Sequence, residues 1–258
     1  MHSVFLQENE FVQTERVRIG EIPCLRMRPK GVEINLPTVV YYHGWSSNKE
    51  YQRFKGMTLA SFGYQVLVPD AIHHGERDPI PYRDAQAMEQ YFWRVVLQNV
   101  EESKGLIEEI INTHNGDPNR IGVMGNSMGG FSAAGVFIQN ENIRCMVNFN
   151  GSCAWMKAEE IFRKTKGISE SSAERGMDLS AYDPMANKTR LRGRPILMLH
   201  GDSDTSVPID SQRLFYFEVE GLYKETPEKL KFLEIPRMDH YISTGMLEEA
   251  ILWLEKYL

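Results

Sequence analysis

The chain has 258 residues, 42% of them hydrophobic and 25% charged, as expected of a globular protein large enough for one α/β domain. Its formal net charge of -6 argues against nucleic acids and anionic membrane surfaces as partners, because both attract basic proteins. No apolar run reaches the roughly 18 residues that a membrane helix needs, and the N-terminus lacks the apolar core of a signal peptide. We therefore expect a single domain over residues 1–258, located in the cytoplasm.

The three cysteines are Cys24, Cys145 and Cys153. An odd number without metal-type spacing favours free thiols in a reducing compartment over a disulfide framework or a zinc site. The sequence predicts neither a metal nor an organic cofactor.

Two segments near the N-terminus, 11–19 and 22–27, alternate apolar and polar residues, as half-exposed antiparallel strands do. We expect them to form a hairpin at the edge of a sheet. Beyond residue 37 the pattern changes to short continuous apolar runs, which suit strands buried on both faces of a parallel sheet. These runs are 38–42, 65–69, 120–124, 144–149, 195–199 and 230–235.

Stretches with apolar residues at helical spacing separate these runs: 49–62, 84–113, 127–139, 210–223 and 245–257. The alternation predicts an α/β fold with a mostly parallel central sheet and helices on both of its faces. The exception is the segment 152–194, which is too long for a simple connection between two strands. Its first half can form an amphipathic helix and its second half is polar. We expect it to be a cap over the active site, with a surface excursion of no role as the alternative.

The most informative motif is GNSMG, in which Ser127 follows the apolar run 120–124 and precedes a helix-forming stretch. A GxSxG motif between a strand and a helix is typical of a nucleophile elbow. Gly125 and Gly129 remove the side chains that would clash in such a tight turn. Ser127 is therefore the predicted nucleophile.

A serine hydroxyl needs a base to take its proton and an acid to orient that base. Asp204 lies a few residues past the run 195–199, and His240 is the only histidine further along the chain. The order Ser, Asp, His is the one that this architecture uses. Asp202 competes for the role of the acid but is closer to the strand end, where it is expected to serve the turn. Asp239 adjoins His240, and we expect it to be solvated rather than part of the triad.

The oxyanion that forms during acyl transfer requires hydrogen-bond donors. The Met128 amide, at the start of the helix after Ser127, is the first predicted donor, and the Trp45 amide in HGWSSNK is the second. His43 is expected to shape the Trp45 loop rather than act as a base. The pair His73–His74 invites a metal interpretation, but no cysteine or third clustered histidine accompanies it, which favours loop packing.

The chain resembles α/β-hydrolases of the dienelactone-hydrolase and prolyl-oligopeptidase-like group, in the branch of small single-domain serine esterases. The motifs that carry the resemblance span most of the chain: YYHGWSSNK, VPDAIHHGER, DPNRIGVMGNSMGG, LMLHGDSDTSVP and MDHYIS. It implies the same triad of Ser127, Asp204 and His240. Dienelactone hydrolases proper use a cysteine where this chain has Ser127. Prolyl oligopeptidases carry an N-terminal propeller, for which the segment before residue 38 is too short.

These features predict an enzyme that hydrolyses small or medium carboxylic esters through an acyl-enzyme on Ser127. Trp155 and Met156, at the start of the cap, are expected to line the substrate pocket. A small peptidase or acylaminoacyl hydrolase is the alternative within the enzyme class. A binding protein with a vestigial triad is the alternative outside it.

Overall fold

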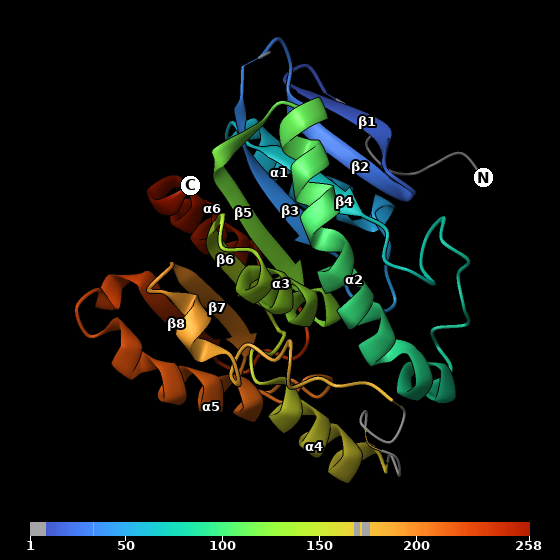
Figure 1. The fold of residues 1–258 in the computed structure, drawn as a ribbon, viewed down its shortest axis with the longest axis vertical. Helices are drawn as coiled ribbons and strands as arrows, with labels where there is room; N and C mark the ends of the chain where they lie inside the picture. The colour runs from blue at the N-terminus through green and yellow to red at the C-terminus, as the bar shows by residue number, and fades with distance from the viewer. Residues whose placement is uncertain (1–8, 33, 168–170, 172–175) are drawn as a thin grey trace.

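The computed structural model describes residues 9–32, 34–167, 171 and 176–258, which fold around an eight-stranded sheet (Figure 1). The strands lie in the order β1-β2-β4-β3-β5-β6-β7-β8. Their bounds are β1 Val12–Ile19, β2 Ile22–Pro29, β3 Leu36–Tyr42, β4 Gln65–Pro69, β5 Gly116–Asn126, β6 Ile143–Phe149, β7 Ile196–Gly201 and β8 Leu230–Ile235. The α-helices are α1 Arg53–Ser61, α2 Ala85–Thr113, α3 Met128–Gln139, α4 Trp155–Lys166, α5 Asp210–Val219 and α6 Thr244–Tyr257. Four 3-10 turns join them, at η1 Glu50–Gln52, η2 Lys188–Leu191, η3 Glu220–Tyr223 and η4 Pro227–Lys229.

The sheet is parallel from β4 through β8, and β2 runs antiparallel to both of its neighbours, β1 and β4. This arrangement confirms the predicted α/β class with its antiparallel N-terminal hairpin. The prediction that both hairpin strands are half-exposed was wrong for Ile22–Pro29, whose first six residues are buried. Of the two hairpin strands, only β1 lies at the edge of the sheet, and β2 has a strand on each side.

Helices cover both faces of the sheet, as predicted. In Figure 1, α2, α3, α4 and α5 lie in front of the strands, and α1 and α6 lie behind them. Two separate apolar clusters correspond to these layers, one containing Phe131 of α3 and Phe215 of α5, the other Leu59 of α1 and Leu254 of α6. The strands between the layers read as continuous apolar runs because both of their faces are buried.

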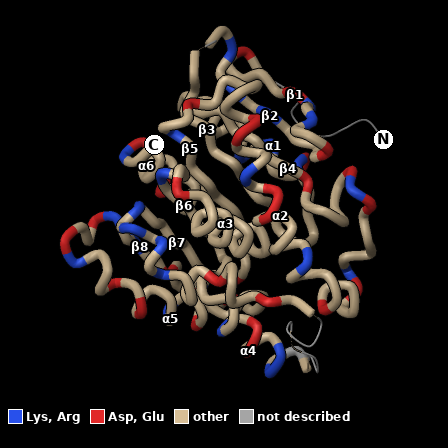
Figure 2. The backbone as a smooth tube through the Cα atoms, in the orientation of Figure 1, with Lys and Arg blue, Asp and Glu red and all other residues tan. Residues whose placement is uncertain are grey.

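Capping residues mark where the helices begin. The Asp84 side chain accepts a hydrogen bond from the Gln86 amide at the start of α2, and the Ser243 hydroxyl accepts one from the Met246 amide at the start of α6. Glycine ends α4, where Gly167 adopts φ 67° in the left-handed region. Residues of both charges are spread over the backbone, as Figure 2 shows.

The predicted cap segment contains α4 followed by turns up to η2. Part of its polar second half, residues 168–170 and 172–175, lies outside the described residues. Its described parts belong to the main core, because Ala158 and Leu179 are each 1% exposed and join the cluster around α3. None of the described helices is long and apolar enough to cross a membrane.

Candidate functional site

The three predicted triad residues lie in loops at the carboxyl ends of the parallel strands. Ser127 directly follows β5, Asp204 lies three residues beyond β7, and His240 lies five residues beyond β8. Because these strands are parallel, the three loops share one edge of the sheet, where ligands of open α/β folds bind.

Ser127 has a strained backbone, with φ 56° and ψ -126°, between the end of β5 and the first residue of α3. A non-glycine residue in this region costs on the order of 1–3 kcal/mol and persists only where the surroundings enforce it. A Cβ atom on Gly125 would lie 2.0 Å from the Gly129 carbonyl oxygen, and one on Gly129 would lie 2.0 Å from the Tyr42 carbonyl oxygen. The two glycines therefore allow the tight turn that presents the Ser127 side chain.

The start of α3 provides amide donors beside Ser127. Met128 is the first residue of this helix, and the first N–H groups of an α-helix have no carbonyl partner within it. The amide of Ser127 itself is bound to the Phe149 carbonyl of the neighbouring strand at 2.9 Å, which fixes the turn to β6. The Met128 amide is therefore placed where a helix N-terminus favours negative charge.

His240 and Asp204 form a direct pair. The Nδ1 atom of His240 lies 2.7 Å from Oδ2 of Asp204, whose side chain is fully buried, whereas 24% of the His240 side chain is exposed. Since a carboxylate oxygen accepts, Nδ1 carries the proton and Nε2 is left to accept one in the neutral imidazole. This is the tautomer that a general base requires.

Hydrogen bonds hold the Asp204 carboxylate in its charged form. Burial alone would raise the pKa of this group, but donation from His200 and His240 outweighs burial and keeps the pKa well below its usual range. The other oxygen, Oδ1, accepts from the amides of Ser206 and Val207, each at 2.8 Å. Asp204 therefore stays ionised beside the imidazole.

The two neighbouring aspartates considered from the sequence have other partners. Asp202 is exposed and accepts from the Arg237 amide at 2.7 Å, which ties the turn after β7 to the turn after β8. Asp239, predicted to be solvated, accepts from the Thr205 amide at 2.8 Å and so holds the loop that carries Asp204. No sequence signal distinguished Asp239 from a free surface carboxylate.

The loop after β3 places Trp45 beside the elbow. A Cβ atom on Gly44 would lie 3.4 Å from Cβ of Ser127, so the backbone next to Trp45 closely approaches the serine. The Trp45 indole N–H donates to the Tyr82 carbonyl at 2.7 Å, and its ring packs edge-on against His74. The loop between β4 and α2 thus fixes the Trp45 side chain, and the backbone that bears the predicted second oxyanion donor is anchored with it.

The buried His43 ring also fixes the loop after β3. Nδ1 of His43 donates to the Gly44 carbonyl at 2.8 Å, and its Nε2 accepts from the Ala71 amide at 3.1 Å. Burial, together with the neighbouring His74, lowers the pKa of His43 to about 4, so it is neutral at pH 7. This placement agrees with the predicted shaping role.

A buried ion pair, not noticed in the sequence, also braces the loop. Nζ of Lys49 lies 2.6 Å from Oδ2 of Asp70, and the two side chains are 2% and 0% exposed. The Lys49 amide donates to the other Asp70 oxygen at 2.9 Å. A lysine and an aspartate 21 positions apart give no local pattern, so only the fold reveals the pair.

Asn150, after β6, links the three loops that carry the predicted triad, and the sequence analysis missed it. Its side-chain amide donates to the Tyr241 carbonyl at 2.7 Å, and its oxygen accepts from the Gly201 amide at 3.1 Å. It directly follows Phe149, whose carbonyl binds the Ser127 amide. Its φ of 47° places it in the left-handed region, where asparagine is tolerated.

The two predicted pocket residues occupy different environments at the start of α4. Trp155 is 0% exposed and packs against the Trp93 ring at 5.6 Å, whereas Met156 is 46% exposed. Complete burial favours a core role for Trp155 over contact with a substrate, so its assignment to the pocket stays a prediction. The buried Asp183 carboxylate accepts hydrogen bonds from the amides of Trp155 and Met156 at 3.1 and 3.0 Å. Asp183 therefore lies at the start of α4.

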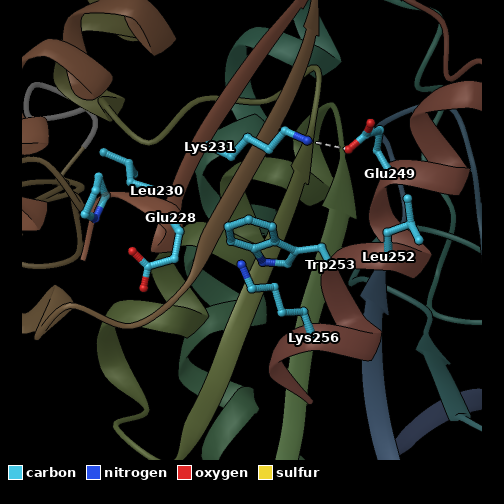
Figure 3. A pocket seen from close by; sticks show the side chains of 8 residues that line it. Glu228, Leu230, Lys231, Glu249, Leu252, Trp253 and Lys256 are labelled. Atoms are coloured by element: carbon cyan, nitrogen blue, oxygen red, sulfur yellow. Dashed lines mark hydrogen bonds and ion pairs between the residues drawn. The ribbon is translucent and has the colours of Figure 1, made fainter.

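Two further observations concern ligand sites elsewhere. Within the described ranges, no group of three or more histidine, cysteine, aspartate or glutamate side chains could hold a metal ion. A groove of about 430 Å³ lies between α6 and the β8 edge (Figure 3). Trp253 lines it, as do Lys231 and Glu249, which form an ion pair at 2.6 Å. None of the predicted site residues lines this groove.

Comparisons with known proteins agree with this geometry. Residues 98–255 match the model of the prolyl oligopeptidase family. "Putative esterase YitV" of Bacillus subtilis is 29% identical over 96% of this chain and 100% of its own length, and "Esterase YjfP" of Escherichia coli is 28% identical with the same coverage. Among solved structures, TT1662 from Thermus thermophilus has a TM-score of 0.78 at 24% identity, covering 95% of this chain and 97% of its own.

Proposed function

Because the chain belongs to the prolyl oligopeptidase family and is a serine hydrolase of the α/β-hydrolase fold, we propose that it cleaves carboxylic esters of small or medium acyl groups, with Ser127 as nucleophile. The observation that carries this proposal is the strained Ser127 turn at the same sheet edge as the pair of His240 and Asp204, which are 2.7 Å apart. Strained residues of this kind cluster at active sites, which supports a catalytic role for Ser127.

The proposed reaction has two halves. The Ser127 hydroxyl attacks the ester carbonyl while its proton passes to Nε2 of His240, and Asp204 stabilises the imidazolium that results. The amides of Met128 and Trp45 bind the oxyanion, each donor contributing roughly 3 kcal/mol to the transition state. The proton on His240 leaves with the alcohol, and water then repeats the attack on the acyl-enzyme with His240 again as the base.

The coverage of the relatives favours esters over peptides. The two esterase-named relatives match this chain over 100% of their own lengths. The acylaminoacyl peptidase of Pyrococcus horikoshii matches over 41% of its chain, at 18% identity and a TM-score of 0.71. A peptidase or acylaminoacyl hydrolase is the second candidate, favoured by the family match itself. It needs the same residues and a stronger protonation of the amine leaving group.

Labelling with a fluorophosphonate and turnover of matched nitrophenyl esters and anilides test the proposal together. We expect the wild type to be labelled and to hydrolyse esters faster than anilides, and Ser127→Ala to lose both labelling and turnover while its melting temperature changes little. Hydrolysis by Ser127→Ala above a few per cent of wild type would show that another residue is the nucleophile. Faster anilide cleavage would select the peptidase.

We also propose that the segment 152–194 bounds the acyl or alcohol side of the substrate, since it begins two residues after Asn150, which follows β6. Met156, which is exposed, is the side chain placed to act there, and Trp155 supports it from the core. Met156→Ala should change the preferred ester chain length or raise KM, with melting nearly unchanged. Trp155→Ala should cost about 3–5 kcal/mol of stability through its lost packing. If neither variant changes selectivity across the ester series, the segment is not a specificity lid.

A further inference from the structure

A second histidine contacts the carboxylate of Asp204. His200 lies in β7, and its Nε2 is 3.2 Å from Oδ2 of Asp204, the same oxygen that binds His240. The two side chains are 1% and 0% exposed, so water does not screen this contact. Oδ1 accepts from the amides of Ser206 and Val207, and Oδ2 has two histidine nitrogens within 3.2 Å, so the carboxylate is surrounded by protein groups.

The protonation of His200 at this nitrogen follows from its other neighbour. Nε2 also lies 2.9 Å from the Val207 carbonyl oxygen, which can only accept a hydrogen bond. Nε2 must therefore carry a proton, which is donated to the Val207 carbonyl while Oδ2 of Asp204 lies 3.2 Å from the same nitrogen. The Val207 amide meanwhile donates to Oδ1 of Asp204 at 2.8 Å, so His200 and Val207 together hold the carboxylate from two sides.

We infer that His200 is a positioning residue of the catalytic acid: by sharing Oδ2 of Asp204 with His240, it orients the carboxylate and limits how strongly that carboxylate attracts the proton on His240. This inference rests on the proposed triad. It follows from the closeness of two protonated nitrogens to one oxygen, because the positive end of each N–H stabilises the carboxylate charge and so weakens its attraction for the other proton.

The charged groups around His200 are few and have partners of their own. Glu234 of β8 lies opposite His200 in the strand register, and its carboxylate is bound by Arg213 at 2.6 Å. Asp202 and Asp239, on the adjoining turns, accept from backbone amides. Asp204 is therefore the carboxylate that Nε2 of His200 contacts directly.

The test compares His200→Leu, which removes the donor, with His200→Gln, whose side-chain amide places an N–H at a similar reach. Without the donor, the Asp204 carboxylate binds the charged form of His240 more strongly, so proton uptake inactivates the enzyme at higher pH. We expect the acidic limb of the kcat/KM profile for a nitrophenyl ester to move up by about half to one pH unit in His200→Leu. We also expect kcat to fall with little change in KM, since the acid does not touch the substrate. His200→Gln should restore much of both.

A second measurement does not depend on turnover. The proton between His240 Nδ1 and Asp204 should give a downfield proton NMR resonance, and a stronger hydrogen bond in His200→Leu should move it further downfield. Met198→Val, on the same strand and the same face, is the control for lost packing and should leave the pH profile and the resonance in place. Met198 is 0% exposed, as the control requires.

The outcomes separate this inference from the proposed function. If Ser127→Ala is inactive but His200→Leu keeps the wild-type pH profile and resonance, His200 is an ordinary core residue and the inference fails while the triad stands. An equal shift in Met198→Val would also overturn the inference, because the effect would then be a general loosening of β7. If Ser127→Ala remains active, the proposed function itself fails.

Discussion

Single atoms determine whether the elbow at Ser127 can form. A Cβ on Gly129 would meet two backbone oxygens, those of Tyr42 at 2.0 Å and His43 at 2.6 Å, and backbone cannot swing aside as a side chain can. Gly129→Ala should therefore destabilise the protein by about 3 kcal/mol or more and displace the strand β3 from the elbow. Thermal and denaturant unfolding measure the loss.

The matched control for Gly129→Ala is Gly105→Ala. Gly105 lies in the middle of α2, where an added Cβ would meet nothing within 4 Å. This substitution should stabilise the protein by about 0.5–1 kcal/mol, because alanine favours the helix. Equal changes in the free energy of unfolding in the two variants would contradict the close contact between β3 and the turn at Ser127.

The same scale distinguishes the two candidate acids. Asp204→Asn keeps the shape of the side chain but favours the wrong His240 tautomer, and kcat should fall by about 10⁴ if general triad behaviour transfers. Asp202→Asn removes only one charge from a turn whose amide contact an asparagine oxygen can still accept. Steady-state kinetics of the two variants on one ester decide the matter, and the reverse ranking would transfer the role to Asp202.

At the scale of elements, the three loops that carry the proposed triad depend on one another through Asn150. Its amide bridges Gly201, before the Asp204 loop, and Tyr241, beside His240. Asn150→Ala removes both contacts, and the resulting displacement of about 1 Å should lower kcat by up to about 100-fold with a small change in KM.

Asn140→Ala provides the comparison for Asn150→Ala. Asn140 also makes two side-chain hydrogen bonds, to Ser103 and Val136, but at the far end of α3. Its loss should reduce stability and leave kcat nearly unchanged. Equal kinetic effects of the two variants would mean that Asn150 acts only through general stability.

The strands and helices were predictable because burial imposes a regular pattern on them. Runs such as 38–42 and 65–69 read as buried parallel strands, and both are strands in the structure. The order of the strands is not encoded locally, and so Ile22–Pro29 was expected to be half-exposed, although it lies between β1 and β4 and its first six residues are buried. The glycines of GNSMG likewise made the turn at Ser127 predictable from the sequence. His200 and Asn150 were not predictable, because they contact residues that only the folded chain brings near.

At the scale of the whole molecule, the three cysteines report on the integrity of the core. Cys24, Cys145 and Cys153 are free and each is 0% exposed, and burial raises the pKa of each thiol to about 12. The thiolate is the reactive form, so the native protein should react with a thiol reagent at neutral pH only through unfolding. In denaturant, three equivalents of thiol reagent should react per chain, and without denaturant almost none should react. Rapid labelling of the native protein would mean that the core opens locally.

The Asp183 carboxylate has a consequence for how chain length can vary around the catalytic edge. Because it binds the amides of Trp155 and Met156, Asp183 is held against the first residues of α4, whatever the length of chain between the two positions. The entropy of closing a flexible loop grows only with the logarithm of its length, and a doubling costs only about 0.6 kcal/mol. A change in chain length between the end of α4 and Leu179, which both pack in the core, should therefore cost little, while the strand ends before Ser127, Asp204 and His240 stay in place.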